Sequence, residues 1–222
     1  MTLTLPDGRD VRPGKILCIG RNYVAHVQEM GDVAEADPIA FLKPTTALVG
    51  DGGTVVLPRQ SGDVHHELEL VAVVGRGGRH IAEAEALDHV AAYALGLDLT
   101  ARDVQAAAKA NKAPWSVAKG FDTFAPLGPL APASAVGNPQ ALEISLAVNG
   151  EERQRGTTDL MVFSVARIVA FLSSVFTLEP GDLLYTGTPA GVGPVRDGDT
   201  LVATGTGLPT LTVTARREPA GE

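Results

Sequence analysis

Apolar residues that alternate with polar ones recur along the chain and predict a protein built mainly of strands. The segments with this pattern are 15–20, 54–58, 67–75, 93–100, 143–150, 182–187 and 210–216. Asn149 and Gly150 form a strong hairpin signal, because both residues tolerate a positive φ. Helical stretches are fewer and cover residues 22–30, 101–112 and 164–176, the last with Ser164 placed as an N-cap. This balance predicts a β-rich α+β fold, a sandwich or roll, rather than a doubly wound sheet.

One predicted strand begins with two residues of like charge, Glu67 and Glu69. Alternation places both side chains on one face, while the run from Leu70 to Val74 is apolar on both faces, as in a strand covered on both sides. A third acid, Asp98, follows another apolar run. Because a buried carboxylate must be protonated, paired or metal-bound, three such acids indicate a site for a hard divalent cation.

Two other interpretations of this cluster stay open on the residues alone. Glu67 and Glu69 could face solvent on a half-exposed strand, which is the common meaning of two glutamates separated by one residue. His65 shares their face, so a His–carboxylate site for Zn²⁺ or Fe²⁺ is a further alternative. We rank His65 below the three acids as a ligand.

Composition and charge exclude several classes of partner. The chain has 222 residues, of which 45% are hydrophobic and 20% charged, and no repeat or linker divides it, so we treat residues 1–222 as one domain. The formal net charge of −8, without a basic run, argues against a nucleic-acid partner. The most apolar long segment, 161–176, contains Arg167 and suits a packed helix better than a membrane span. The first residues lack a secretory-signal pattern, so we expect a cytoplasmic protein.

Seven motifs resemble, in order, those of the fumarylacetoacetate hydrolase family. They read CIGRNYVAHVQEMG, AFLKPTTALVG, HHELELVAVVG, GLDLTARDVQ, PWSVAKGFDTFAPLGP, VNGEERQ and LLYTGTPAGVGPV, and extend over about residues 15–195. The pattern is most similar to that of the short acylpyruvase and oxaloacetate decarboxylase members. The resemblance implies a mixed β-sandwich roll, a homodimer, and a Mg²⁺ ion, replaceable by Mn²⁺, with Glu67, Glu69 and Asp98 as its ligands.

The resemblance also changes the interpretation of two residues in the predicted helix 22–30. His26 and Glu29 lie three residues apart and share a helix face. Such a pair is most often ordinary surface charge. The hydrolytic members of the family, however, carry a His–Glu dyad on a short lid helix, where the carboxylate orients the imidazole that takes a proton from water. The resemblance therefore implies a catalytic role for both residues.

Further residues are candidates for contact with the substrate. Lys119 is either a solvated loop lysine or, by the family match, an ammonium beside the substrate carboxylate or the developing enolate. Gln105 can hydrogen-bond the substrate, whereas Arg102 could equally make a structural ion pair with Asp103 or another acid. Thr188 lies in a glycine-rich turn that lacks the ending of a P-loop and is by itself a tight turn before the last strands; the family resemblance implies that Thr188 and nearby backbone N–H groups hold a substrate carboxylate. Arg21 is a weaker candidate of the same kind.

These residues together predict an enzyme that cleaves small 2-oxo acids with a divalent metal, through a metal-bound pyruvate enolate. Acylpyruvates such as fumarylpyruvate or acetylpyruvate would be hydrolysed, and oxaloacetate would be decarboxylated. The alternatives within the family are a decarboxylase or isomerase of 2-hydroxymuconate-type diacids and an oxaloacetate tautomerase. A non-catalytic metal- or metabolite-binding protein with the same fold is the alternative from another class.

Overall fold

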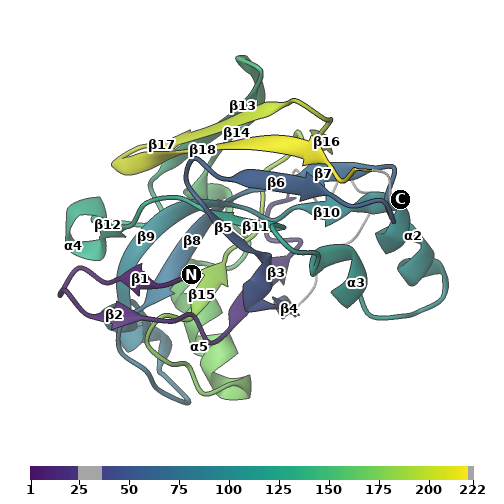
Figure 1. Cartoon of the computed structure of the whole chain (residues 1–222). Coiled ribbons are helices and arrows are strands. Elements are labelled where there is room, and N and C mark those ends of the chain that lie inside the picture. Colours follow the sequence, from purple (N-terminus) through teal and green to yellow (C-terminus); the bar gives the residue numbers. More distant parts are fainter. Residues whose placement is uncertain (25–36, 220–222) are drawn as a thin grey trace.

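A computed structural model describes residues 1–24 and 37–219, and its largest part is a curled sheet of eight strands (Figure 1). The strand order is β4-β3-β15-β8-β9-β11-β5, and β12 pairs with β9. The bounds are β3 (Ile16–Gly20), β4 (Ile39–Lys43), β5 (Leu48–Gly50), β8 (Leu68–Val74), β9 (Val90–Leu97), β11 (Ala125–Leu127), β12 (Ala131–Pro132) and β15 (Leu183–Tyr185). The sheet is mixed, because β15 runs parallel to β3 and β11 runs parallel to β5, whereas its other pairs are antiparallel.

A second sheet of five strands covers one face of the first (Figure 1). Its order is β14-β13-β17-β18-β6, with β6 (Thr54–Leu57), β13 (Glu143–Val148), β14 (Glu151–Thr157), β17 (Thr200–Gly205) and β18 (Leu208–Arg217). Strands β17 and β18 contact β9, and β13 contacts β8. The β13–β14 hairpin turns at Asn149 and Gly150, whose φ angles are 52° and 80°. The predicted hairpin is therefore confirmed, and so is the predicted mixed β-roll.

Two small sheets and a few helices complete the described structure. Strands β1 (Leu3–Thr4) and β2 (Asp10–Val11) form a pair, and β7 (Val64–His66) lies between β10 (Thr100–Ala101) and β16 (Gly193–Pro194). The α-helices are α2 (Arg102–Ala110), α3 (Ser116–Lys119), α4 (Ala133–Val136) and α5 (Val165–Val175), and the 3₁₀ helices are η1 (Thr45–Ala47), η2 (Glu83–His89) and η3 (Thr158–Leu160). Among the described helices, none has the length and hydropathy to cross a membrane.

The two longest helices confirm the sequence predictions for 101–112 and 164–176. Ser164 caps α5 as expected, because its hydroxyl accepts a hydrogen bond of 3.1 Å from the backbone N–H of Arg167. The guanidinium of Arg167 lies 3.2 Å from the carboxylate of Asp37. The third predicted helix, 22–30, falls mostly in the segment 25–36, which lies outside the described residues.

The two faces of β8 pack into two separate hydrophobic cores. Leu68, Leu70, Ala72 and Val74 enter the core between the two large sheets, whereas the alternating residues at 71 and 73 enter a second core on the opposite face. All seven residues of β8 are buried. This burial explains why the strand is apolar at successive positions rather than at every second one. It also means that acids at the mouth of β8 have little access to water.

Candidate metal centre

Glu67, Glu69 and Asp98 meet where β8 begins and β9 ends. The two strands are antiparallel and pair Leu68 with Leu97, so the residues that flank this pair come together. The backbone N–H of Asp98 donates to the carbonyl of Glu67 over 2.8 Å. The three acids are only 5%, 1% and 1% exposed, and each offers a carboxylate oxygen within 4.8 Å of the others. The interpretation of Glu67 and Glu69 as solvent-facing residues is therefore wrong.

Alternation predicts one continuous strand over residues 65–75, but this strand is interrupted at Glu67. Strand β7 ends at His66 and β8 begins at Leu68, and β7 pairs with β10 and β16 rather than with the neighbours of β8. The N–H of Leu68 donates instead to the side chain of Gln154, over 2.9 Å. Nε2 of His65 lies 3.0 Å from a carboxylate oxygen of Asp63. Among the described residues, the cluster of possible metal ligands contains the three acids and not His65. The structure therefore does not support the alternative of a His–carboxylate site.

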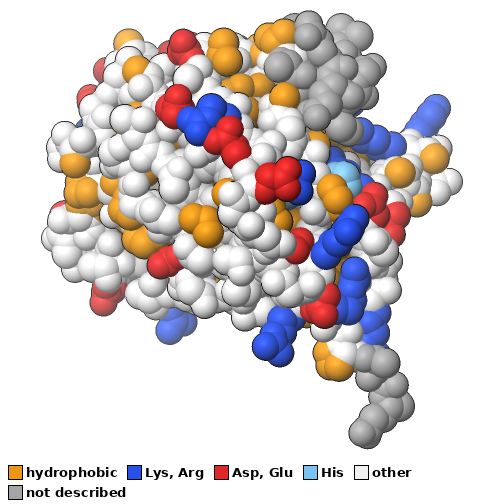
Figure 2. Space-filling view, turned by 90° about the horizontal axis from the view of Figure 1, so that it is seen from above, with side chains coloured by type: hydrophobic (Ala, Val, Ile, Leu, Met, Phe, Trp, Pro, Cys, Tyr) orange, Lys and Arg blue, Asp and Glu red, His pale blue; other side chains and the backbone are white. Residues whose placement is uncertain are grey.

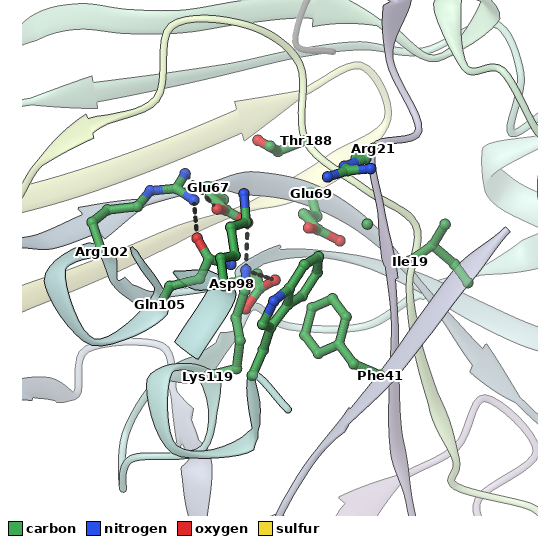
Figure 3. Close-up of a pocket in the computed structure, with 13 residues that line it drawn as sticks. Ile19, Arg21, Phe41, Glu67, Glu69, Asp98, Arg102, Gln105, Lys119 and Thr188 are labelled. Carbon is green, nitrogen blue, oxygen red and sulfur yellow. Dashed lines mark hydrogen bonds and ion pairs between the residues drawn. The ribbon is translucent and has the colours of Figure 1, made fainter. Parts of the chain in front are cut away.

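Three basic side chains contact the cluster from three different segments, and Figure 3 shows two of them, Lys119 and Arg102. Lys43, at the end of β4, lies 2.6 Å from one oxygen of Asp98, and Lys119 lies 2.6 Å from the other. Lys119 also reaches Glu67 at 2.9 Å, and Arg102 contacts the second oxygen of Glu67 at 2.6 Å. These three cations pair with Glu67 and Asp98 and so balance the charges of those two acids. This pairing satisfies the requirement that buried charges have partners of opposite sign.

The structure decides between the alternatives left open for Lys119 and Arg102, and it adds a third cation to the site. Lys119 is not a solvated loop lysine, because it ends α3 and is 3% exposed. Arg102 pairs with an acid of the cluster and not with Asp103, whose carboxylate accepts from Ser61 and nearby backbone N–H groups. Lys43, also 3% exposed, was not recognised as a site residue. The one sequence feature that could have identified it is its position at the end of the apolar segment Ile39–Lys43.

Glu69 is held by a different interaction. One of its oxygens accepts a hydrogen bond of 2.7 Å from the backbone N–H of Gly187, in the glycine-rich turn after β15. Gly187 has a φ of 97°, and a Cβ there would lie 2.6 Å from the Cβ of Asn22, so only glycine fits. Asn22 in turn donates to the carbonyl oxygens of Thr186 and Phe163, over 2.7 Å and 3.0 Å.

The electrostatics of the cluster favour binding of a cation. Burial, and then the charges of Asp98 and Glu67, raise the pKa of Glu69 well above its usual value. Burial acts to lower the pKa of Lys119, but the same two acids outweigh this effect and raise it. Carboxylate oxygens are the donors preferred by hard divalent cations, and a cation at this point would relieve the repulsion that Glu69 experiences. The residues present therefore fit a divalent metal ion.

A pocket opens over the acids. Its lining includes the three acids and the other predicted site residues that the structure describes, namely Arg21, Gln105, Lys119 and Thr188. In Figure 3, Thr188 and Arg21 lie on one side of the acids, and Lys119 and Phe41 on the other. Phe41 contacts Trp115 edge to face, with ring centroids 6.0 Å apart, and forms an apolar wall. His26 and Glu29 lie outside the described residues.

Comparison with known proteins agrees with this fold. The family described as fumarylacetoacetate (FAA) hydrolase C-terminal matches residues 15–216. A relative from Arabidopsis thaliana, named oxaloacetate tautomerase FAHD1, mitochondrial, is 46% identical over 194 residues, which are 87% of this chain and 87% of the relative. The described fold is that of a known enzyme family. The chain belongs to the fumarylacetoacetate hydrolase family.

Solved structures extend the comparison. The crystal structure of fumarylpyruvate hydrolase from Pseudomonas aeruginosa, in complex with Mn²⁺ and pyruvate, has a TM-score of 0.93 and 43% identity, and the match covers 98% of this chain and 96% of that one. The structure of 5-carboxymethyl-2-hydroxymuconate delta-isomerase from Mycobacterium smegmatis has a TM-score of 0.85 and 36% identity, with 99% and 100% covered. These names cover a hydrolase, an isomerase and a tautomerase.

The raised pKa of Glu69 predicts how stability depends on pH in the metal-free protein. A carboxyl group whose pKa is raised by folding contributes stability below its unfolded pKa and loses that contribution as the pH rises through the folded value. In EDTA, Glu69→Gln should therefore gain in melting temperature over the wild type as the pH rises from about 5 to about 8. In saturating Mn²⁺ the order should reverse. A difference that does not change with pH would contradict this account.

The pairing of Lys43 predicts a stability loss that a metal can reduce. Lys43→Met leaves the charge of Asp98 with one partner fewer, and breaking a buried pair costs about 3–5 kcal/mol. We expect a loss of this size in chemical denaturation with EDTA, and a smaller loss with Mn²⁺, which supplies replacement charge. Lys112→Met removes an exposed lysine and is the matched control. An equal loss for Lys43→Met in both conditions would show that the lysine and the metal do not share Asp98.

Proposed function

We propose that this protein is a divalent-metal-dependent enzyme that acts on small 2-oxo acids and hydrolyses acylpyruvates such as fumarylpyruvate. The observation that carries the proposal is the convergence of three buried acids with balancing cations at the base of a pocket. Arg21 and Lys109 also line this pocket, on a chain whose net charge is −8. With a divalent cation present, the pocket would carry net positive charge and attract a small anion.

The described residues have distinct roles in this proposal. A bound divalent metal would stabilise negative charge as it develops on the C2 oxygen of the substrate. Glu67, Glu69 and Asp98 would hold that metal, and Lys119 would pair with two of these acids and add positive charge beside the enolate. Thr188 and Arg21, on the opposite side of the pocket, would bind the C1 carboxylate, and Gln105 would orient the substrate.

Hydrolysis needs an activated water in addition to these residues. We assign this task to His26, oriented by Glu29, as the family resemblance implies. The imidazole takes a proton from water, and the oxygen attacks the distal C4 carbonyl. The C3–C4 bond then breaks, its electron pair remains on the pyruvate fragment, and a proton returns to C3. The products are pyruvate and a carboxylic acid, so that one water is consumed for each acylpyruvate.

Oxaloacetate is the second candidate substrate, and the names of the relatives favour it. The Arabidopsis thaliana relative is called an oxaloacetate tautomerase. Decarboxylation of oxaloacetate releases CO₂ and takes up a proton at C3, and tautomerisation only moves a proton between C3 and the C2 oxygen. Neither reaction uses an attacking water, so the described residues around the acids could support both. Stabilisation of the same enolate would therefore serve three reactions.

A substrate panel tests the proposal. We expect turnover of fumarylpyruvate, acetylpyruvate or oxaloacetate with Mg²⁺ or Mn²⁺, loss of turnover in EDTA, and recovery when the metal is returned. A hydroxymuconate-type diacid belongs in the panel because one structural relative is named as a delta-isomerase. Glu69→Ala should lower both metal binding by calorimetry and turnover, by at least about 100-fold, as expected when a ligand itself is removed. Activity that survives complete chelation would refute the metal-dependent mechanism.

Replacement of His26 separates hydrolysis from enolate chemistry. His26→Ala should lower hydrolysis of acylpyruvates by about 10²–10⁴-fold, the usual contribution of a general base. Tautomerisation or decarboxylation of oxaloacetate should fall much less, because no water attacks. His80→Ala, at an exposed position, is the matched control. Equal losses of both activities in folded, metal-loaded His26→Ala protein would contradict separate roles.

A further inference from the structure

Gln154 is a buried residue on an otherwise mostly polar edge strand. Strand β14 forms one edge of the five-stranded sheet, and its outer side chains are charged. Glu151 pairs with Arg153, and Glu152 with Arg155, and acidic and basic side chains lie next to one another on this face (Figure 2). Gln154 is only 1% exposed and points inward. No role in metal or substrate binding has been assigned to it so far.

The amide of Gln154 uses both of its ends. Its oxygen accepts hydrogen bonds of 2.9 Å from the backbone N–H of Leu68 and 2.9 Å from Nδ1 of His66. Its nitrogen donates to the hydroxyl of Thr188 over 2.8 Å and to the carbonyl of Pro189 over 3.0 Å. Gln154 thus connects the second sheet to the turn after β15 and to the residue between two acids of the cluster.

These partners determine which terminal atom of the amide is the oxygen and which is the nitrogen. A backbone N–H can only donate and a backbone carbonyl can only accept, so Leu68 requires the oxygen of Gln154 and Pro189 requires its nitrogen. The same argument makes Nδ1 of His66 the protonated nitrogen. The contact between β14 and the turn is also close, because a Cβ on Gly156 would lie 2.6 Å from the Cβ of Pro189. The amide therefore has one orientation.

This orientation determines what the hydroxyl of Thr188 can do. A hydroxyl has one proton to donate and lone pairs to accept with. Because its oxygen receives the N–H of Gln154, the hydroxyl proton is directed away from Gln154. Thr188 lines the pocket over the acids (Figure 3). Its hydroxyl is thereby set to donate to an acceptor in the pocket.

We propose that Gln154 is a positioning residue of this site, which orients the Thr188 hydroxyl as a donor to the carboxylate of a 2-oxo acid. This inference rests on the proposed function, because it needs a carboxylate substrate in the pocket. Through the N–H of Leu68, the same amide holds the backbone between Glu67 and Glu69 in place. A single side chain from the second sheet thus supports both the substrate side and the metal side of the site.

Gln154→Glu distinguishes the effect of Gln154 on substrate binding from its effect on metal binding. A carboxylate at this position still accepts from Leu68 and His66, but in its ionised form it cannot donate to Thr188 and instead attracts the hydroxyl proton. With the Mn²⁺-loaded protein, pyruvate binding measured by titration calorimetry should weaken by about tenfold or more. Mn²⁺ affinity should change far less, and the KM for an acylpyruvate should rise more than kcat falls. Gln140→Glu is the matched control, because the amide of Gln140 also bonds at both ends, but to Thr158 and to Val165, the first residue of α5.

A double-mutant cycle identifies the route of the effect. If Gln154 acts through Thr188, then Gln154→Glu should weaken pyruvate binding little further once Thr188→Val has removed the hydroxyl. Additive losses, or unchanged pyruvate affinity in Gln154→Glu, would overturn the inference. Should Gln154→Glu not fold, Thr188→Ser and Thr188→Val decide: the inference requires that serine retains binding and valine loses it. Wild-type, Mn²⁺-loaded protein that binds no pyruvate would overturn the proposed function as well.

Discussion

The balance of charge among buried side chains is the constraint on which the rest of the structure depends. Glu67, Glu69 and Asp98 are brought together by the pairing of β8 with β9, and burial of three carboxylates without partners would be prohibitively costly. The chain meets this cost with Lys43 and Lys119, and with Arg102 at the edge of the site. The cations come from β4, α3 and α2, so these elements are held against the ends of β8 and β9. The fold at this end of the molecule is organised by the site.

The site also depends on both large sheets, although its acids lie on one. Glu69 is positioned by the turn after β15, and Thr188 in the same turn is held by Gln154 from β14. Substrate-side and metal-side groups therefore share a support that lies outside the sheet carrying the acids. Changes in the packing of the two sheets would alter the positions of side chains in the pocket, even where no residue of the pocket is substituted.

The sequence predicted the strands well where an apolar run was long, and it identified the three acids as candidates because they lie at the ends of such runs. It failed at Glu67, where the strand breaks because Leu68 donates to Gln154, a partner 86 residues away. Lys43 was missed because a lysine at a strand end is ordinary until the fold places Asp98 beside it. His65 was left as an alternative ligand because alternation alone cannot show that β7 leaves the large sheet. The homodimer, the cytoplasmic location and the roles of His26 and Glu29 stay predictions.

The central claim is that one divalent cation binds where the three acids converge. The most direct measurement is an anomalous difference map, recorded at the manganese absorption edge, from crystals of this protein grown with Mn²⁺. The account predicts one strong peak in contact with carboxylate oxygens of Glu67, Glu69 and Asp98. A map without a peak at this position, in crystals where the protein is fully saturated with Mn²⁺, would contradict it.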